Sequence, residues 1–402
     1  MDVMDEVSRL NKSAITCVET HTVGMPCRII IKGYPSVCGS LASQRDQASE
    51  KYDYIRKRVI LEPRGHSDMF GAILRPDTEF TESGEAHMGL LYIHSRGYSK
   101  MCGHATLAVS RFLVDAHDPD VFPKRHLVKF DPVKQESKLV LHTLGGLVEA
   151  TVPTTPDGRR SDPSRPVSFV ALPAYAMATD LEVSIPPECR WPELGSRASV
   201  SVSIAYCSAF SCQTQLGDLG FPADALHGSV GFEKLRHAVA QLKMALGGSE
   251  YQRFLKCPTT GAVGSIFGVM IGVKGLGNQA EGSKGVETGL YIFADGVIDR
   301  SPTGSVAAAR NAIAFAKGDL DIGESWTYHC LVSNAYGKKQ GFDAKVLRSE
   351  GRKELTRGGF AAGPVVVEVQ GNAYYTGYHT FVVEEDDPLG DGGFSLELLS
   401  SR

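Results

Sequence analysis

Two short turns of this 402-residue chain carry residues whose types and spacing could do chemistry. The first turn holds Cys102, Gly103 and His104 and precedes residues 105–114, which have a helical composition. A cysteine at the start of a helix lies where unpaired backbone N–H groups and the helix dipole favour the thiolate. A thiolate there acts as a base, a nucleophile or a metal ligand. The alternative is a small buried hydrophobe, which we expect for the other eight cysteines.

The second turn holds Asp299, Pro302, Thr303, Gly304 and Ser305, and it leads into a small-residue helix expected at 306–316. The hydroxyl of Thr303 is a poor proton carrier at neutral pH but a good hydrogen-bond partner. Its structural alternative is a helix N-cap, and the two roles are compatible. Pro302 stiffens the turn, while Asp299 brings a carboxylate close to it.

The two turns occupy equivalent places in the two halves of the chain. Cys102 and Thr303 lie 201 positions apart, and each is followed by a glycine and then a helix of small residues. This spacing is too long for a solenoid repeat and predicts two similar domains that face each other across a cleft. Two helix N-termini meeting there would bind a carboxylate and stabilise negative charge on the neighbouring carbon. Both glycines would let a ligand approach the backbone closely.

Hydrophobic periodicity and turn residues predict the elements that position these turns. We expect strands at residues 14–18, 27–31, 72–74, 90–94, 200–205 and 290–294, an exposed charged helix at 44–59, a helix at 232–246, a turn at 21–26, a polar surface loop at 153–166 and a glycine-rich loop at 275–289.

Composition narrows the class of protein. A hydrophobic content of 42% with 22% charged residues is typical of a soluble globular chain, and the net charge of −4 predicts neither nucleic-acid nor membrane binding. Nine irregularly spaced cysteines and a charged beginning without an apolar segment favour a reducing, cytoplasmic location without a signal peptide. No zinc, P-loop or dinucleotide motif is present, so we expect neither a metal nor a cofactor.

At these residues the sequence resembles the proline racemase family. The two turns carry the resemblance, and the supporting segments run in the same order from Ile15 to Pro388. These segments are His21-Thr22 to Pro26, Glu62 to His66 with Asp68-Met69, Ala205-Tyr206 and Tyr375-Thr376-Gly377.

The resemblance implies an α/β (α+β) fold of two pseudo-symmetric domains, of the proline racemase and diaminopimelate epimerase type, with the active site in the cleft between them. We expect a first domain at 1–180, a second at 181–388 and a tail at 389–402, with the last fifteen or so residues returning to the first domain. Racemases of this family carry a cysteine in both turns. Thr303 in the second turn resembles the branch of trans-3-hydroxy-L-proline dehydratases.

The resemblance also implies roles for single residues. Cys102 takes the α-proton, and Thr303 replaces the second cysteine and is a candidate relay to the departing hydroxyl. With one thiol, inversion should be poor, and a carbanion with a C3 hydroxyl can expel it to give pyrroline-2-carboxylate. The groups expected to contact the substrate carboxylate and ring nitrogen are Gly103, His104, Asp299, Gly304 and Ser305.

Four departures from the family pattern leave the accepted ring substituent open, namely Val23, Met25, Cys207 and Val306. The alternatives are a hydroxyproline 2-epimerase or proline racemase-like isomerase, and a non-catalytic protein that binds proline analogues. The expected partner is a small cyclic imino acid, and a homodimer is a candidate assembly.

Overall fold

The computed structural model describes residues 14–227, 231–294, 296–336, 340–354, 360–396 and 399, and it forms two compact units. The first unit comprises residues 1–169 and 372–402, and the second comprises residues 170–371. Both expected boundaries differ from this division. Residue 180 lies inside a strand of the second unit, and residues 373–381 form a strand that pairs with the first.

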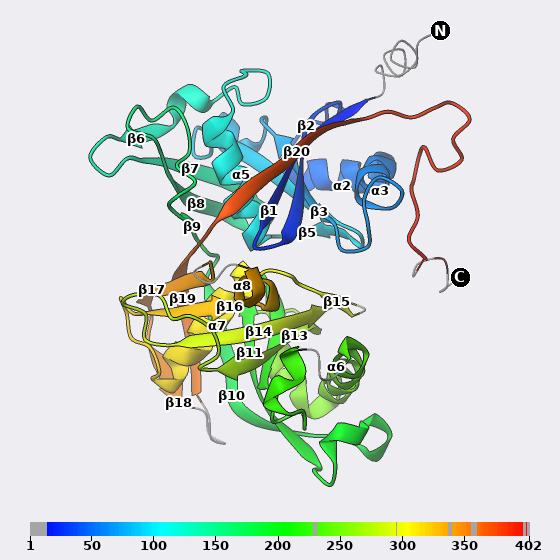
Figure 1. Ribbon diagram of the computed structural model, residues 1–402, viewed down its shortest axis with the longest axis vertical. Coiled ribbons are helices and arrows are strands. Elements are labelled where there is room, and N and C mark those ends of the chain that lie inside the picture. The colour runs from blue at the N-terminus through cyan, green and yellow to red at the C-terminus, as the bar shows by residue number, and fades with distance from the viewer. Residues whose placement is uncertain are drawn as a thin grey trace. The chain divides into compact units, whose positions relative to one another are not determined.

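The first unit consists of a mixed sheet, a central helix and flanking short helices (Figure 1). Its strands are β1 (Ile15–Thr22), β2 (Met25–Lys32), β3 (Phe70–Arg75), β4 (Met88–His94), β5 (Gly97–Ser99), β6 (Lys129–Asp131), β7 (Glu136–Thr143), β8 (Gly146–Pro153), β9 (Val167–Val170), which continues into the second unit, and β20 (Ala373–Phe381). Its helices are α2 (Leu41–Lys51), α3 (Asp53–Ile60), α4 (Glu79–Glu82) and α5 (Gly103–Asp115).

The second unit repeats this plan with longer strands (Figure 1). Its strands are β10 (Ala174–Ser184), β11 (Ser199–Cys207), β12 (Ala209–Gln215), β13 (Ile266–Lys274), β14 (Val286–Phe293), β15 (Val297–Ile298), β16 (Ser325–His329), β17 (Phe342–Ser349), β18 (Arg352–Glu354) and β19 (Phe360–Gly371). Its helices are α6 (Phe232–Leu246), α7 (Gly304–Lys317) and α8 (Leu331–Tyr336).

The two sheets have the same strand order and the same directions of pairing. In the first unit the order is β20, β1, β2, β3, β4, β7, β8, β9, with parallel pairs only at β2–β3 and β4–β7. In the second it is β10, β11, β12, β13, β14, β16, β17, β19, with parallel pairs at β12–β13 and β14–β16. Pairing of β10 with β19 closes the second sheet into a barrel. The predicted pseudo-symmetric α/β fold is confirmed.

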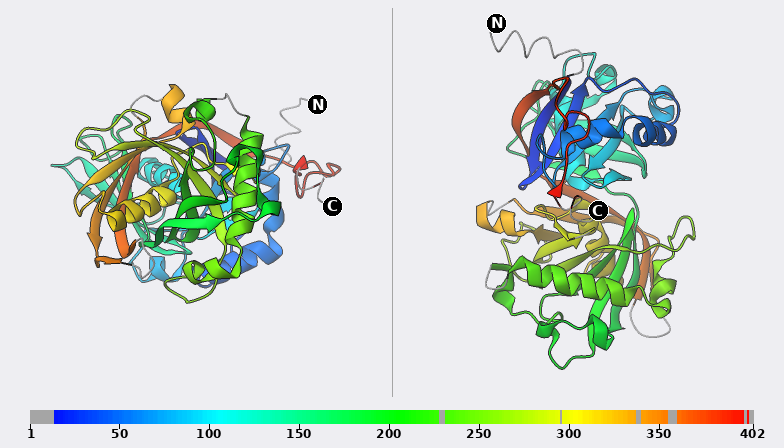
Figure 2. Two further views of the ribbon diagram at one scale, coloured as in Figure 1. Left: turned by 90° about the horizontal axis from the view of Figure 1, so that it is seen from below. Right: turned by 90° about the vertical axis from the view of Figure 1, so that its right-hand side faces the viewer.

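One helix of each unit packs against the concave side of its own sheet. In the second unit α7 packs against β10, β11, β12, β16, β17 and β19, and most of its residues are alanines or other buried side chains. Small residues suit this place, because a helix inside a barrel leaves little room for side chains. In the first unit α5 packs against β1, β2, β3, β8 and β20. Helix α6 instead lies along the outer face of the second sheet, next to β13 (Figure 2).

The charged stretch at 44–59 forms two helices rather than one exposed helix. Helix α2 ends at Lys51 and α3 starts at Asp53, and α3 buries most of its length. Gln44 is fully buried, and its side chain accepts from Arg75 Nε at 2.6 Å and donates to the Gly39 carbonyl at 2.9 Å. The exposure expected from the polar pattern holds for most of α2, whose buried residues are Leu41, Gln44 and Ala48. It is wrong for α3, which is mostly buried because its polar groups are satisfied inside the fold.

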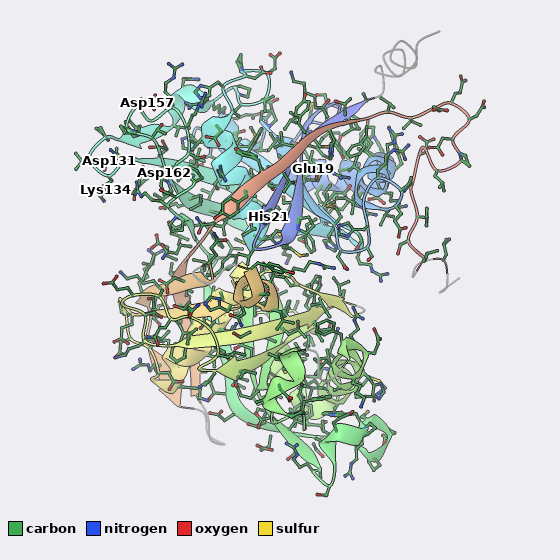
Figure 3. The ribbon with its side chains drawn as sticks, in the orientation of Figure 1. Glu19, His21, Asp131, Lys134, Asp157 and Asp162 are labelled. Carbon is green, nitrogen blue, oxygen red and sulfur yellow. The ribbon has the colours of Figure 1, made fainter. Side chains whose placement is uncertain are left out.

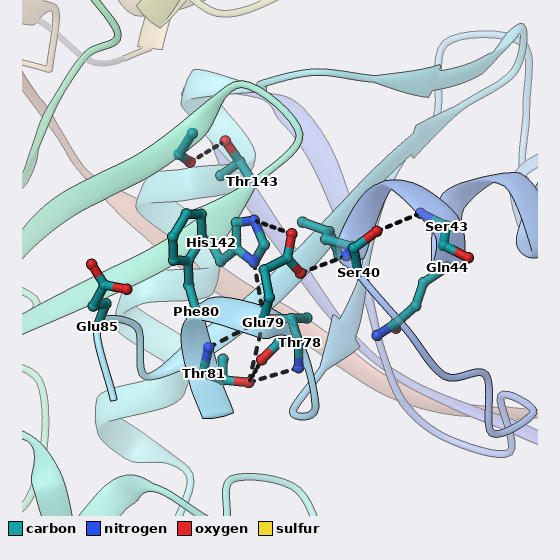
Figure 4. Close-up of polar contacts among 12 residues, drawn as sticks. Ser40, Ser43, Gln44, Thr78, Glu79, Phe80, Thr81, Glu85, His142 and Thr143 are labelled. Atoms are coloured by element: carbon teal, nitrogen blue, oxygen red, sulfur yellow. Dashed lines mark hydrogen bonds and ion pairs between the residues drawn. The ribbon is translucent and has the colours of Figure 1, made fainter. Parts of the chain in front are cut away.

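Helices α2 and α4 are joined to the sheet through polar side chains (Figure 4). The Glu79 carboxylate accepts the Leu41 amide at 2.8 Å and lies 3.9 Å from His142 Nε2 on β7. His142 Nδ1 lies 2.9 Å from the Thr78 hydroxyl. The Phe80 ring meets the imidazole edge-on, with 4.6 Å between the two ring centroids. These contacts hold the start of α2 against β7.

The loops match the predictions with shifts at their ends. Val23 and Gly24, with φ of 51° and 85°, form the two-residue turn between β1 and β2. The polar loop runs from residue 154 to residue 166 and carries Asp157 and Asp162 at the surface (Figure 3). The glycine-rich loop ends at residue 285, because residues 286–289 belong to β14. It links two antiparallel strands, as expected for a segment that is not a dinucleotide fingerprint.

Within the part of the chain that the structure describes, no helix has both the length and the apolar character needed to cross a membrane.

Candidate active-site turns

Cys102 occupies the N-cap position of α5, directly after the β4–β5 hairpin. Its backbone is extended, with φ of −144° and ψ of 107°, and its side chain does not cap the helix. The residue is only 7% exposed, and its sulfur lies 3.4 Å from His104 Nδ1. An imidazole at this distance can accept the thiol proton and leave a thiolate beside a helix N-terminus.

A chain of hydrogen bonds fixes the backbone of Cys102. Its carbonyl accepts the Thr106 amide at 2.9 Å and the Thr106 hydroxyl at 2.8 Å. The Thr106 hydroxyl lies 2.6 Å from the hydroxyl of Tyr92 on β4, and both side chains are buried. The cysteine is therefore held by the neighbouring strand as well as by its own helix.

His104 is buried in the first turn of α5. The Phe70 ring meets its imidazole edge-on at 5.0 Å, and the Thr22 hydroxyl donates to its carbonyl at 3.0 Å. These contacts come from β3, which packs against the imidazole, and from β1, which binds the backbone of the same residue.

Most of the other cysteines behave as buried hydrophobes, as the sequence predicted. Burial raises the pKa of Cys17 and Cys207 to about 12 and raises the pKa of Cys27, Cys212 and Cys330 as well. Cys38, which is exposed, and Cys257 are the exceptions, and sequence reasoning missed the lowered pKa of Cys257. Its small burial raises the thiol pKa, but hydrogen bonds from Thr259, Thr260 and Tyr206 outweigh it and lower the pKa to about 6. The threonines that follow it in sequence were the available signal.

Thr303 occupies the N-cap position of α7, which corresponds to Cys102 in the first unit. Its φ of 62° and ψ of 93° are uncommon for a β-branched residue, and such a conformation costs on the order of 1–3 kcal/mol. The side chain does not cap the helix, so the structural alternative considered for this threonine is wrong in detail. Its hydroxyl instead donates to Asp299 Oδ2 at 2.7 Å.

Asp299 organises the second turn from the end of the β14–β15 hairpin. Its Oδ1 accepts the Ser301 amide at 2.7 Å and the Ser301 hydroxyl at 2.9 Å, and the Ser301 hydroxyl in turn accepts the Thr303 amide at 3.2 Å. Asp299, Ser301 and Thr303 are each less than one tenth exposed. Three hydrogen bonds to one buried carboxylate hold Thr303 in its strained conformation.

The predicted site residues thus gather into two groups, one in each unit. Cys102, Gly103 and His104 lie together at the start of α5. Asp299, Thr303, Gly304 and Ser305 lie together at the start of α7, with Ser305 half-buried in the first helical turn. Sequence reasoning gave no role to Thr106 and Ser301, which bond predicted residues, or to Tyr92, which bonds Thr106. Their signal was weak, because a Thr or Ser near a helix start is common.

Two of the four departures lie in each unit. Val23 lies in the β1–β2 turn and Met25 begins β2. Both are buried, and His21 Nδ1 accepts the Gly24 amide at 3.1 Å. Cys207 ends β11, and Val306 is buried in the first turn of α7.

Two polar segments make structural contacts with each other. The carbonyl of Arg64 accepts from Arg28 Nη1 at 2.7 Å, and the Arg64 guanidinium binds Asp387 at 3.0 Å. The segment from Glu62 to His66 therefore forms a structural turn. Asp387 ends the acidic run Glu384-Glu385-Asp386-Asp387, and its ion pair with Arg64 joins this end of the run to the turn. Among the described residues no group of three or more His, Cys, Asp or Glu side chains is placed to hold a metal ion.

Comparison with known proteins then decides the family. The profile described as proline racemase matches residues 17–394, which is most of the chain. The chain belongs to the proline racemase family. The resemblance seen in the two turns is thereby confirmed.

Similar proteins are named as a dehydratase, a racemase or an epimerase. The chain is 34% identical to the trans-3-hydroxy-L-proline dehydratase of Homo sapiens and 35% identical to that of Mus musculus, with 94% of each chain covered. It is 27% identical to the proline racemase of Clostridioides difficile, over 94% of this chain and 97% of the other. A solved hydroxyproline epimerase from Agrobacterium vitis, with bound trans-4-hydroxy-L-proline, has a TM-score of 0.68 at 20% identity and covers 96% and 95% of the two chains. This structure supports the fold.

Proposed function

We propose that this protein is a cofactor-independent hydro-lyase that dehydrates trans-3-hydroxy-L-proline to pyrroline-2-carboxylate. One observation carries the proposal: the helix N-caps of the two equivalent turns hold a thiol and a threonine hydroxyl, Cys102 and Thr303. The relatives at 34–35% identity that are named as dehydratases of this substrate support it.

In the proposed reaction the thiolate of Cys102 removes the α-proton. His104 takes the thiol proton beforehand, which its 3.4 Å contact with the sulfur permits. The electron pair of the C–H bond remains on the α-carbon, where fixed backbone dipoles stabilise the charge. We assign contacts with the substrate carboxylate to Gly103, His104, Gly304 and Ser305, and contact with the ring nitrogen to Asp299.

Elimination follows because the carbanion carries a hydroxyl on the next carbon. The electron pair forms the C2–C3 double bond, the C3–O bond breaks, and the oxygen leaves as water after it gains a proton. The hydroxyl of Thr303 passes this proton to the leaving oxygen. Asp299, hydrogen-bonded to the threonine at 2.7 Å, takes a proton from the ring ammonium group of the substrate and returns it to Thr303. The enamine then moves its N–H proton to C3 and becomes the imine. Cys102 returns the α-proton to solvent, so atoms and charge balance.

The same pair explains why inversion is disfavoured. Inversion needs an acid on the opposite face that can protonate the α-carbon. A threonine hydroxyl is too weak an acid to do so at neutral pH, whereas it can share a proton with a departing hydroxide.

The test is a product assay by NMR in heavy water, with trans-3-hydroxy-, trans-4-hydroxy- and unsubstituted L-proline. We expect pyrroline-2-carboxylate from the first substrate and no α-deuterated D-isomer from any of them. Formation of α-deuterated D-isomer as the main product would show an epimerase or racemase. Binding of pyrrole-2-carboxylate without turnover of any substrate would show a binding protein.

Replacement of the thiol tests the proposed base. Cys102→Ser should lower turnover by at least about a thousandfold, since a serine hydroxyl is a far weaker base than a thiolate. Cys38→Ser is the matched control, because Cys38 is exposed and should tolerate the change. Retained activity in Cys102→Ser would overturn the assignment of the base.

A further inference from the structure

The second unit has a partly open cavity of about 130 Å³ beside the second half of α7. Strands β10 to β14 and β16 line it together with Arg310, Ile313 and Lys317 of the helix. Arg310 follows Thr303 by seven residues, which is about 10 Å along the helix at 1.5 Å per residue. The cavity is therefore separate from the turn that begins α7, and it is large enough for a small molecule.

Arg310 is built into the wall of this cavity. It is 4% exposed, its Nη2 lies 2.7 Å from Glu287 Oε2, and its guanidinium stacks 4.0 Å above the Tyr328 ring. Gln215 donates to the other oxygen of Glu287 at 3.0 Å, so the carboxylate is satisfied from two sides. Arg310 Nη1 finds no hydrogen-bond acceptor among the described residues.

Two glycines make room for this ion pair. Gly272 and Gly289 are register partners on β13 and β14. A Cβ at Gly272 would lie 2.0 Å from Glu287 Oε1, and a Cβ at Gly289 would lie 3.1 Å from Arg310 Nη1. The strands are therefore shaped around the charged pair, although a buried pair of this kind gives little net stability by itself.

Two more donors in the wall lack acceptors. The side-chain nitrogens of Gln213 and Trp326 are buried, and within the described parts of the chain neither has a hydrogen-bond partner. Gln213 is the register partner of Met270. The Met270 sulfur and Arg310 Nη1 both lie next to Gly289, so Gln213 and Arg310 belong to the same part of the wall. Buried donors without acceptors are unfavourable, so a cavity with three of them fits a ligand that presents oxygen acceptors.

The charged side chains of the wall indicate the charge of that ligand. Lys317 pairs with Asp180 at 2.7 Å, Lys274 with Asp319 at 3.7 Å, and Arg310 with Glu287. These cations are thus balanced, and the carboxylate of Asp218 is left over without an ion pair among the described residues. A simple anion would meet a wall with one excess negative charge, whereas a zwitterion offers an acceptor to the donors and a cation to Asp218.

We propose that this cavity binds a small zwitterion of the α-amino or imino acid class. Its carboxylate accepts from Arg310, Gln213 and Trp326, and its ammonium group lies toward Asp218. The site is additional to the proposed catalytic turns and does not depend on the reaction they perform. Because Arg310 and Thr303 belong to one helix, an occupied cavity rigidifies the helix whose first turn carries Thr303.

The test is isothermal titration calorimetry of the full chain with L-proline, in the presence of saturating pyrrole-2-carboxylate to block the proposed active site. We expect one saturable event per chain, with Kd raised at least about tenfold in Gln213→Leu, because a charge-assisted hydrogen bond is lost. Trp326→Phe provides a second variant that keeps the ion pair intact. Gln252→Leu, a glutamine outside the cavity, should bind as the unchanged chain does.

Acetate and ethylammonium, each carrying one of the two charges, should bind at least tenfold more weakly than L-proline. Absence of any binding heat, or unchanged affinity in both Gln213→Leu and Trp326→Phe, would overturn the site. Acetate binding as tight as that of L-proline would overturn the zwitterion in favour of an anion. If pyrrole-2-carboxylate itself fails to bind, the proposed function is weakened, while the dependence on Gln213 still decides this site.

Discussion

Asp299→Asn is the substitution that most directly probes how the second turn is built. The carboxylate accepts three hydrogen bonds: two at Oδ1 from Ser301 and one at Oδ2 from Thr303. An asparagine can keep the two bonds at its carbonyl oxygen, but its NH₂ group then faces the Thr303 hydroxyl and cannot accept from it. One charge-assisted bond is therefore lost, and the remaining bonds become neutral.

The size of the effect follows from burial. A hydrogen bond to a charged group contributes about 1.5–3 kcal/mol, and Asp299 is 7% exposed, so solvent does not replace the lost acceptor. For a unit of about 200 residues this corresponds to a fall in Tm of roughly 3–12 °C. Turnover should fall further, by a hundredfold or more, because Thr303 loses both its orientation and its proton source.

The assay is thermal unfolding by circular dichroism together with NMR turnover of trans-3-hydroxy-L-proline. Asp162 is a matched control, since its Oδ1 accepts the Ser164 amide at 2.9 Å and the Ser164 hydroxyl at 2.6 Å in an exposed Asp-x-Ser turn (Figure 3). Asp162→Asn should change stability by less than about 0.5 kcal/mol. Equal Tm and equal turnover in Asp299→Asn and the unchanged chain would refute the reasoning.

Other substitutions test separate parts of the structure. Thr303→Cys should introduce α-deuterium exchange and epimerisation, measured by NMR in heavy water, and its absence would weaken the requirement for an acid on the second face. Thr106→Val should lower the free energy of unfolding, measured with urea, by about 1–3 kcal/mol more than Tyr92→Phe does, because it leaves the buried Tyr92 hydroxyl unpaired. A larger loss in Tyr92→Phe than in Thr106→Val would contradict the hydrogen-bond chain. Burial, and then the charges of Arg56 and Arg96, lower the pKa of His94 to about 4, so the unfolded chain takes up this proton first. The contribution of neutral His94 to the free energy of unfolding is complete above pH 6.5 and should fall by up to about 3 kcal/mol between pH 6.5 and pH 4. In His94→Asn the free energy of unfolding, measured by urea titration at each pH, should lose less over this range.

The sequence predicted the two turns well because their physics is local. A small polar or thiol residue, a glycine and a run of small residues indicate a helix start wherever they occur, and α5 and α7 begin one residue after Cys102 and Thr303. The shared plan of the two units could be predicted from these few positions, because equivalent turns need equivalent supports. The resemblance to the proline racemase family was found from the same residues.

What the sequence did not predict depends on contacts between distant residues. The break between α2 and α3 at Tyr52 has no glycine or proline to mark it, and the burial of Gln44 depends on Arg75 of β3. The left-handed backbone of Thr303 is imposed by Asp299 and runs against the preference of a β-branched residue. The cavity beside Arg310 forms only when six strands, β10 to β14 and β16, are in register.

The pairing of β1 with β20 bears on how the chain is made. The first strand emerges from the ribosome early, yet its partner at residues 373–381 emerges after nearly all of the chain has been synthesised. The second unit is contiguous and closes its barrel with β19, so all its strands are available before β20 is translated. The second unit can thus complete its fold first. Until β20 has been synthesised, the sheet of the first unit stays incomplete, with an unpaired edge along β1. A chain that stops at residue 371 would keep every strand of the second barrel and leave that edge open.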